Sequence, residues 1–394
     1  MGSQRFPIGG KGGKTVSRLQ ALRKFGQSIW LDYVQRSLIT SGELRRMVEA
    51  DGLSGVTSNP TIFEKAIAGS GDYDDRLEAI LADNPRAEPR TIYELLAIED
   101  IQMAADVLRM VYDETGGADG FVSLEASPHL AHNTEGTLGE VRRLWKSVAR
   151  PNVMIKVPGT PEGIPAVEAL IAEGININIT LMFSLSHYEA VAQAYLRGLG
   201  RCATPESVAS VASFFVSRVD TVVDRALEAI GTPQALALRG KAAIANAKLV
   251  YRRFRAIFDG EAFSPLRRKG ARVQRPLWAS TGTKNPAYSD VLYVEGLIGP
   301  DTVNTLPPAT LDAFRDHGEV SRAAVQEHWE EAWSSLARLK ELGIDLEAVT
   351  EKLQTDGVAA FAASFDQLLN ALGEKHKTII ARQVDQQSRG VRGE

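Results

Sequence analysis

The chain has 394 residues, of which 44% are hydrophobic and 24% are charged, and its formal net charge is −4. This composition is typical of a folded globular protein with one large domain and extensions, or with two domains. The charge gives no general attraction to nucleic acid or to an anionic membrane. A single cysteine, Cys202, excludes an intramolecular disulfide and favours a reducing compartment. With no apolar run of membrane-spanning length and no signal-peptide pattern, we expect a cytoplasmic protein.

Eight stretches rich in β-forming residues alternate with longer helical patterns between Ser28 and Pro307. This alternation is typical of βα units around a parallel sheet. The predicted strands are SIWLDYV (28–34), GVTSN (55–59), FVSLEA (121–126), NVMIKV (152–157), NINITLMF (176–183), SVASFFVSRV (210–219), PLWAST (276–281) and TVNTLP (302–307). Eight such units predict a (β/α)8 barrel, and an open doubly wound sheet is the structural alternative.

The segments between the strands predict outer helices, because their apolar residues recur three and four positions apart. We divide the chain into a flexible leader with a first helix over 1–25, a barrel catalytic domain over 26–307 and a C-terminal helical extension over 308–394. An apolar stripe in the extension predicts a helix that packs on the barrel. The stripe consists of Val349, Leu353, Val358, Phe361, Phe365, Leu368 and Leu372.

A lysine stands inside the fourth predicted strand, NVMIKV (152–157). Side chains alternate between the two faces of a strand, so Lys156 lies opposite a face made of valine and isoleucine. The lysine is therefore predicted to point into the barrel. An ammonium group in that position is costly unless it is paired or loses its proton.

The fifth predicted strand carries a polar face in which Asn176, Asn178 and Thr180 alternate with isoleucines. Parallel strands are normally covered on both sides, so these side chains need partners, and an active site would supply them. Two carboxylates reach the same interior by the same parity, Asp32 in the first strand and Glu125 in the third. Both lie late in their strands, near the C-terminal mouth where such barrels hold catalytic groups.

The buried lysine has two interpretations. In the first, Lys156 belongs to a structural ion-pair network with Asp32 or Glu125, although desolvation makes such networks a weak source of stability. In the second, Lys156 reacts as a neutral amine and forms a Schiff base with a ketone. One carboxylate would move protons while the carbinolamine forms and loses water, and the other would deprotonate the hydroxyl that becomes the leaving aldehyde.

This aldol chemistry needs neither a metal nor an organic cofactor. A metal-polarised carbonyl is the chemical alternative, and only His129 and His132 suggest ligands for it. Their spacing alone is weak evidence for a metal site, so we expect none.

Several motifs, taken in order along the chain, resemble those of transaldolases, in particular of their longer bacterial form. The motifs are LDYVQR with Asp32, GVTSNPTIFEKA with Asn59, SLEASP with Glu125, MIKVPGT with Lys156, and INITLMFS with Asn178 and Thr180. The lysine and the second asparagine are 22 residues apart, which is the family's spacing. The resemblance runs from about Gly26 to Pro307 and extends into the helical tail.

The resemblance implies a Schiff base on Lys156, a proton relay from Glu125 through a water held by Thr180, and Asp32 as the acid and base at the C4 hydroxyl. The implied reaction reversibly transfers a dihydroxyacetone unit between sugar phosphates in the pentose phosphate pathway. The donor would be sedoheptulose 7-phosphate or fructose 6-phosphate, and the acceptor glyceraldehyde 3-phosphate or erythrose 4-phosphate.

Substrate-binding residues follow from the same resemblance. Asn59 and Asn178 would hold the sugar hydroxyls and the dihydroxyacetone adduct. In SFFVSR, Ser213 and Arg218 match the family's serine and phosphate-clamping arginine. A solvated surface arginine is the alternative interpretation of Arg218.

The seventh strand departs from compact members of the family, in which an arginine closely follows the serine. Here ASTGTKNP keeps the serine as Ser280, and Lys284 would have to replace the arginine from a longer turn. A lysine binds phosphate as a point charge but lacks the bidentate fork of arginine.

Two other functions stay open at this point. A related Schiff-base aldolase would release free dihydroxyacetone, and the sequence around the lysine does not separate the two. A non-catalytic sugar-phosphate sensor would have lost part of the lysine, glutamate and aspartate set.

We expect sugar phosphates as ligands, no nucleic-acid or membrane partner, and a monomer or homodimer. Some relatives carry a glucose-6-phosphate isomerase on the same polypeptide, for which the residues after Pro308 are too few.

Overall fold

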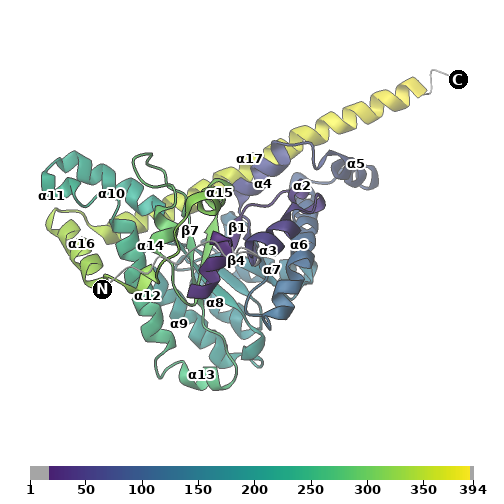
Figure 1. Ribbon diagram of the computed structural model, residues 1–394. Helices are drawn as coiled ribbons and strands as arrows, with labels where there is room; N and C mark the ends of the chain where they lie inside the picture. The colour runs from purple at the N-terminus through teal and green to yellow at the C-terminus, as the bar shows by residue number, and fades with distance from the viewer. Residues whose placement is uncertain (1–16, 391–394) are drawn as a thin grey trace, which may run out of the picture.

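The computed structural model describes residues 17–390, and within them eight parallel strands close into a barrel (Figure 1). Each strand pairs with its neighbours in chain order, and β8 pairs with β1. The strands are β1 (Gln27–Asp32), β2 (Gly55–Thr57), β3 (Phe121–Glu125), β4 (Val153–Pro158), β5 (Ile177–Met182), β6 (Ser210–Phe215), β7 (Arg275–Ala279) and β8 (Thr302–Leu306). The predicted (β/α)8 barrel is confirmed, and the alternative of an open sheet is wrong. Residues 1–16 of the predicted leader lie outside the described residues.

Helices connect the strands and cover the outside of the barrel. They are α1 (Arg18–Leu22), α2 (Arg36–Thr40), α3 (Glu43–Asp51), α4 (Pro60–Ala68), α5 (Asp74–Asp83), α6 (Pro89–Glu114), α7 (Thr134–Val148), α8 (Gly163–Ala172), α9 (Leu185–Arg201), α10 (Ser217–Ile230), α11 (Pro233–Leu236), α12 (Ala242–Phe258), α13 (Ser264–Arg268), α14 (Leu292–Gly296), α15 (Pro308–His317), α16 (Trp329–Glu341) and α17 (Leu346–Gly390). Short 3-10 helices are η1 (Arg23–Phe25), η2 (Pro128–Leu130), η3 (Pro205–Ser207) and η4 (Ala324–Gln326). No helix in residues 17–390 is long and apolar enough to cross a membrane.

The register of the strands brings the inward polar residues to one level of the barrel. Glu125 is opposite Lys156, and Lys156 is opposite Asn178. Asp32 is opposite Thr57 on the next strand. The alternate residues of these strands are mainly valine, isoleucine and leucine, and they are buried beneath the helices.

The sixth predicted strand is too long. β6 ends at Phe215 and α10 begins at Ser217, so the last three residues of SVASFFVSRV (210–219) are helical. Beyond the strand, Val219, Val223 and Leu227 recur every four residues and are all buried. This helical period overrides the β-preference of the local valines.

Asn176 shares the parity of Asn178 and Thr180 but lies just before β5, where backbone groups bond to its side chain. Its Nδ2 donates to the carbonyls of Pro151 at 3.0 Å and Val153 at 3.2 Å, and its Oδ1 accepts from the backbone N of Ala209 at 2.8 Å. The side chain therefore ties together the chain segments that enter three neighbouring strands. An active site explains Asn178 and Thr180 but is not needed to explain Asn176.

Helix α17 runs across the end of the barrel at which the strands terminate, and its last turns extend past α4 and α5 (Figure 1). It contacts both sides of the barrel mouth: Thr61 Oγ1 of α4 donates to Ser364 Oγ at 2.8 Å, and Gln354 bonds to the ends of β4 and β5. The predicted apolar stripe packs as expected, with Val349 partly buried and six residues buried: Leu353, Val358, Phe361, Phe365, Leu368 and Leu372.

Candidate active site

Lys156 lies inside the barrel, with only 5% of its surface exposed. Its Nζ donates to the carbonyl of Ser58 at 3.0 Å and lies 3.4 Å from Glu125 Oε2. Parallel pairing of β3 with β4 puts the carboxylate directly beside the amine. The inward parity expected for Lys156 and Glu125 is therefore what the structure has.

Glu125 and Thr180 carry polar atoms that the described protein atoms leave without hydrogen bonds. Both carboxylate oxygens of Glu125 and the Oγ1 of Thr180 are buried and lack a hydrogen-bond partner within residues 17–382. Burial raises the pKa of Glu125, and the nearby Lys156 opposes part of this rise. Buried polar atoms are normally hydrogen-bonded, so these groups mark a place where substrate or water can bind.

Asp32 sits at the C-terminal end of β1 and is partly buried. Its Oδ1 accepts from Thr57 Oγ1 at 2.7 Å, and that hydroxyl is also 2.7 Å from Thr305 Oγ1. Burial raises the pKa of Asp32, while Lys156, the Thr57 hydrogen bond, Arg218 and Lys284 lower it, in that order. The carboxylate therefore lies in the field of three cations that come from three different parts of the chain.

Asn178 is held from both sides by serine hydroxyls. Its Nδ2 donates to Ser123 Oγ at 3.0 Å, and its Oδ1 accepts from Ser213 Oγ at 2.6 Å. All three side chains are buried. This chain crosses from β3 to β6 and fixes the plane of the amide beside Lys156, because both ends of the amide are bonded.

Asn59 follows β2 and occupies the N-cap position of α4. Its Oδ1 accepts from the backbone N of Ile62 at 3.0 Å, and Pro60 occupies the first helical position. The cap uses the oxygen of the side chain, so the amide hydrogens are the part of Asn59 that could meet a substrate.

Arg218 lies in the first turn of α10 with its guanidinium between two aromatic rings. The Cζ atom is 5.0 Å from the ring centre of Phe215 and 6.0 Å from that of Phe361 on α17. Burial lowers the pKa of Arg218, and the negative charge of Asp32 raises it. The interpretation as a solvated surface arginine is wrong, since the side chain is partly buried against the barrel mouth.

Ser280 and Lys284 follow β7. Ser280 is in the left-handed region with φ of 55°, and its Oγ lies 3.0 Å from Ser217 Oγ, next to Arg218 in the chain. Lys284 is exposed on a turn in which Thr283 Oγ1 donates to a backbone carbonyl at 2.8 Å. The positive charge of Lys284 lowers the pKa of Asp32.

The two histidines considered as metal ligands do not meet each other. His129 Nε2 is 2.8 Å from Asp366 Oδ1, and His132 Nδ1 is 3.0 Å from Glu162 Oε2. Among the described residues, no three or more His, Cys, Asp or Glu side chains are grouped so that they could hold a metal ion.

Comparison with known proteins decides the family. The sequence profile described as Transaldolase/Fructose-6-phosphate aldolase matches residues 29–372. The chain belongs to this family. It is 49% identical to the transaldolase of Thiobacillus denitrificans over 364 residues, which cover 91% of this chain and 99% of that protein. It is also 46% identical to the transaldolase of Thermobifida fusca over 363 residues (91% and 98% covered) and 44% identical to transaldolase 1 of Streptomyces coelicolor over 384 residues (96% and 98% covered). The resemblance to transaldolases is thereby confirmed.

The candidate site contains residues that were not predicted from the sequence. Thr57 binds Asp32, and the Ser58 carbonyl binds Lys156. Phe215 packs beside Arg218 and, with ring centres 5.2 Å apart, against Phe183. Phe215 could have been found, because it shares the parity of Ser213 on the same strand. The hydrogen bond from Lys156 to the Ser58 carbonyl could not have been predicted, because the alternation of side chains says nothing about bonds to backbone carbonyls.

Proposed function

We propose that the chain is a transaldolase of the pentose phosphate pathway, in which Lys156 forms a Schiff base with a ketose phosphate. The observation that carries this proposal is the buried amine of Lys156, 3.4 Å from Glu125 Oε2 at the inner face of the barrel. The family match and the names of the relatives support the same reaction. No metal or organic cofactor takes part in the proposed steps.

The first step makes a covalent bond between Lys156 Nζ and the C2 carbonyl carbon of the ketose. The neutral amine attacks, and the carbonyl oxygen takes up a proton to give a carbinolamine. Glu125, whose pKa is raised by burial, can hold a proton and deliver it when the carbinolamine loses water. The buried hydroxyl of Thr180 would hold the water through which this proton moves.

The second step breaks the C3–C4 bond. Asp32 takes the proton of the C4 hydroxyl, the C4–O group becomes the aldehyde of the leaving aldose phosphate, and the bonding electrons move toward the iminium nitrogen. The remaining dihydroxyacetone unit stays on Lys156 as an enamine. Asn178, whose amide is fixed by two serines, and the amide hydrogens of Asn59 would hold its hydroxyls.

The enamine then attacks the aldehyde of a second aldose phosphate, and the same groups act in reverse. Arg218 and Lys284 would bind the phosphate group, the first through a planar fork and the second as a point charge. Ser213, whose hydroxyl donates to Asn178, would accept from a substrate hydroxyl, and Ser280 would add a hydroxyl donor. The proposed reaction is the same for a monomer and for a homodimer.

The second candidate function is an aldolase that hydrolyses the enamine and releases free dihydroxyacetone. The family profile includes fructose-6-phosphate aldolases, so this activity has to be tested directly. Product analysis after incubation with fructose 6-phosphate decides between the two. A transaldolase gives sedoheptulose 7-phosphate only when erythrose 4-phosphate is added, whereas the aldolase gives dihydroxyacetone without an acceptor.

The Schiff base itself is tested by borohydride reduction in the presence of fructose 6-phosphate, followed by measurement of the intact mass. We expect a stable sugar-derived mass increase on the wild-type chain and none on Lys156→Ala. Turnover by a wild-type chain that gains no mass under reduction would refute the covalent mechanism. Turnover by Lys156→Ala at the wild-type rate would refute the role of Lys156.

A further inference from the structure

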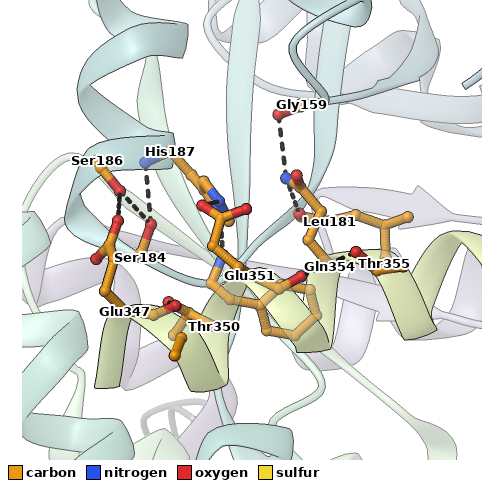
Figure 2. A network of polar contacts seen from close by, with 12 residues as sticks. Gly159, Leu181, Ser184, Ser186, His187, Glu347, Thr350, Glu351, Gln354 and Thr355 are labelled. Atoms are coloured by element: carbon orange, nitrogen blue, oxygen red, sulfur yellow. Dashed lines mark hydrogen bonds and ion pairs between the residues drawn. The ribbon is translucent and has the colours of Figure 1, made fainter. Parts of the chain in front are cut away.

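One buried side chain of α17 joins the ends of two barrel strands. Gln354 is 5% exposed, and its Nε2 donates to the carbonyl of Gly159 at 3.1 Å and to that of Leu181 at 3.0 Å (Figure 2). Gly159 follows β4, which carries Lys156, and Leu181 lies in β5 directly after Thr180. A single amide group therefore connects the strands of the proposed nucleophile and of the proposed water-holding hydroxyl.

The backbone around Thr180 is irregular. The pairing of β5 with β6 shifts its register between Ile179 and Met182, and Leu181 has a φ of 60°, in the left-handed region. That conformation costs a leucine about 1–2 kcal/mol, and bulges of this kind re-aim the neighbouring side chains. The direction of the Thr180 hydroxyl thus depends on a strained segment that other contacts must hold.

Hydrogen bonds hold both peptide groups that flank the strained residue. The backbone N of Gly159 donates to the carbonyl of Thr180 at 2.8 Å, and the carbonyl of Gly159 in turn accepts from Gln354. The second peptide group is bonded directly, because the carbonyl of Leu181 also accepts from Gln354. The amide group of Gln354 thus bonds to two carbonyls on neighbouring strands, one in the strained segment and one in the residue that holds it.

The position of Gln354 along α17 is itself fixed by its neighbours (Figure 2). One turn before it, Glu351 Oε1 lies 2.8 Å from His187 Nε2 at the start of α9. One turn after it, Gly357 lets the helix approach closely, because a Cβ there would lie 2.9 Å from Leu181 Cδ2. These contacts hold this part of α17 against the barrel and so fix the position of Gln354.

We propose that Gln354 is a positioning residue for the Schiff-base reaction, which holds the peptide groups around Leu181 and thereby aims the hydroxyl of Thr180. This inference rests on the function proposed above and extends it to a residue of the C-terminal helix. Gln354 touches none of the reacting atoms. Its loss slows the proton relay of carbinolamine dehydration more than it weakens substrate binding.

Two variants remove the amide donors in different ways. Gln354→Glu keeps the shape of the side chain, and Gln354→Met avoids placing a carboxylate against two carbonyls. Thr355→Ala is the matched control, because it changes the next residue of the same helix on the exposed face. For each protein, kcat and KM are measured together with the rate of borohydride-trapped adduct formation and the melting temperature. We expect a 10- to 100-fold lower kcat and adduct rate for both Gln354 variants, a KM within about 3-fold of wild type, and an unchanged control.

A double-mutant cycle with Thr180→Val separates positioning from a general structural role. If Gln354 acts through the Thr180 hydroxyl, Gln354→Met should lower kcat by less than about 3-fold in the Thr180→Val background. The full loss in that background would overturn the proposal, as would a melting temperature that falls while kcat per folded molecule stays at the wild-type value. The wild-type chain alone tests the proposed function, since absence of turnover there would refute that function and this role with it.

Discussion

The carboxylate of Asp220 gives a pH-dependent prediction that can be worked out from its surroundings. It lies on α10 two residues after Arg218, is buried, and accepts from the backbone N of Ala243 at 2.8 Å and from Tyr293 Oη at 3.0 Å. Burial, helped by the nearby charge of Asp224, raises the pKa of Asp220 from 3.8 to about 6. The folded chain therefore keeps a proton on Asp220 in a pH range where the unfolded chain has released it.

The difference between these two pKa values corresponds to about 3 kcal/mol of unfolding free energy. Because the folded pKa is the higher one, the contribution of Asp220 is fully present below the unfolded pKa and is lost as the pH rises through about 6. Between about pH 5 and pH 7.5 the expected loss is about 1.5 kcal/mol.

Asp220→Asn should remove this loss, because the amide resembles the protonated acid. Its oxygen can still accept from Ala243, and its nitrogen can donate to the hydroxyl of Tyr293. Urea unfolding at several pH values should show the variant gaining about 1.5 kcal/mol relative to wild type between about pH 5 and pH 7.5. Asp83→Asn, at an exposed site, should show a difference that does not vary with pH. A pH-independent difference for Asp220→Asn, or one of opposite sign, would refute the reasoning.

Four further predictions concern the proposed active site. Ser213→Ala removes the hydroxyl bonded to Asn178 at 2.6 Å. Urea unfolding should show an unfolding free energy lower by about 1–2 kcal/mol, and steady-state kinetics should show a kcat about tenfold lower. An unchanged kcat would contradict the role of the hydrogen bond. Arg218→Lys should raise the KM of a phosphorylated acceptor about tenfold and leave that of an unphosphorylated aldehyde unchanged; an equal rise for both would count against phosphate binding. Lys284→Ala should raise the same KM by about 2- to 5-fold in dilute buffer, and added salt should reduce the effect because the lysine is exposed. Since burial raises the pKa of Asp32 above 3.8, kcat/KM should fall with decreasing pH around a midpoint above 3.8, and a midpoint below it would exclude Asp32 as the base.

The barrel and the inward direction of its polar residues could be predicted because both follow from local rules. Alternation within a strand decides the face on which Lys156 lies, and the order of βα units makes each strand the neighbour of the next. The parallel register then brings Glu125 and Asn178 to the level of the lysine. The same parity rule grouped Asn176 with Asn178 and Thr180, because parity gives the face of a residue but not its depth along the barrel.

The contribution of α17 could not be read from the sequence. Gln354 is 195 residues from Gly159 and 173 from Leu181, and a glutamine within an apolar helical stripe carries no signal of what it will meet. The stripe predicted that the helix packs on the barrel, but not that it crosses the end that holds the proposed catalytic groups. The strained φ of Leu181 is equally hidden, because leucine has no preference for that conformation.

The surroundings of Lys156 also bear on the alternative of a purely structural ion pair. A buried pair adds stability only when further hydrogen bonds satisfy the charged groups. Within the described residues, the oxygens of Glu125 have no such hydrogen bonds, and burial raises the pKa of this carboxyl rather than lowering it. A carboxyl whose pKa is raised by burial is better suited to donate a proton and take it back than an ordinary glutamate. The arrangement thus provides poor stabilisation for a permanent ion pair and suits an amine that must be neutral to attack and a neighbour that must then supply a proton.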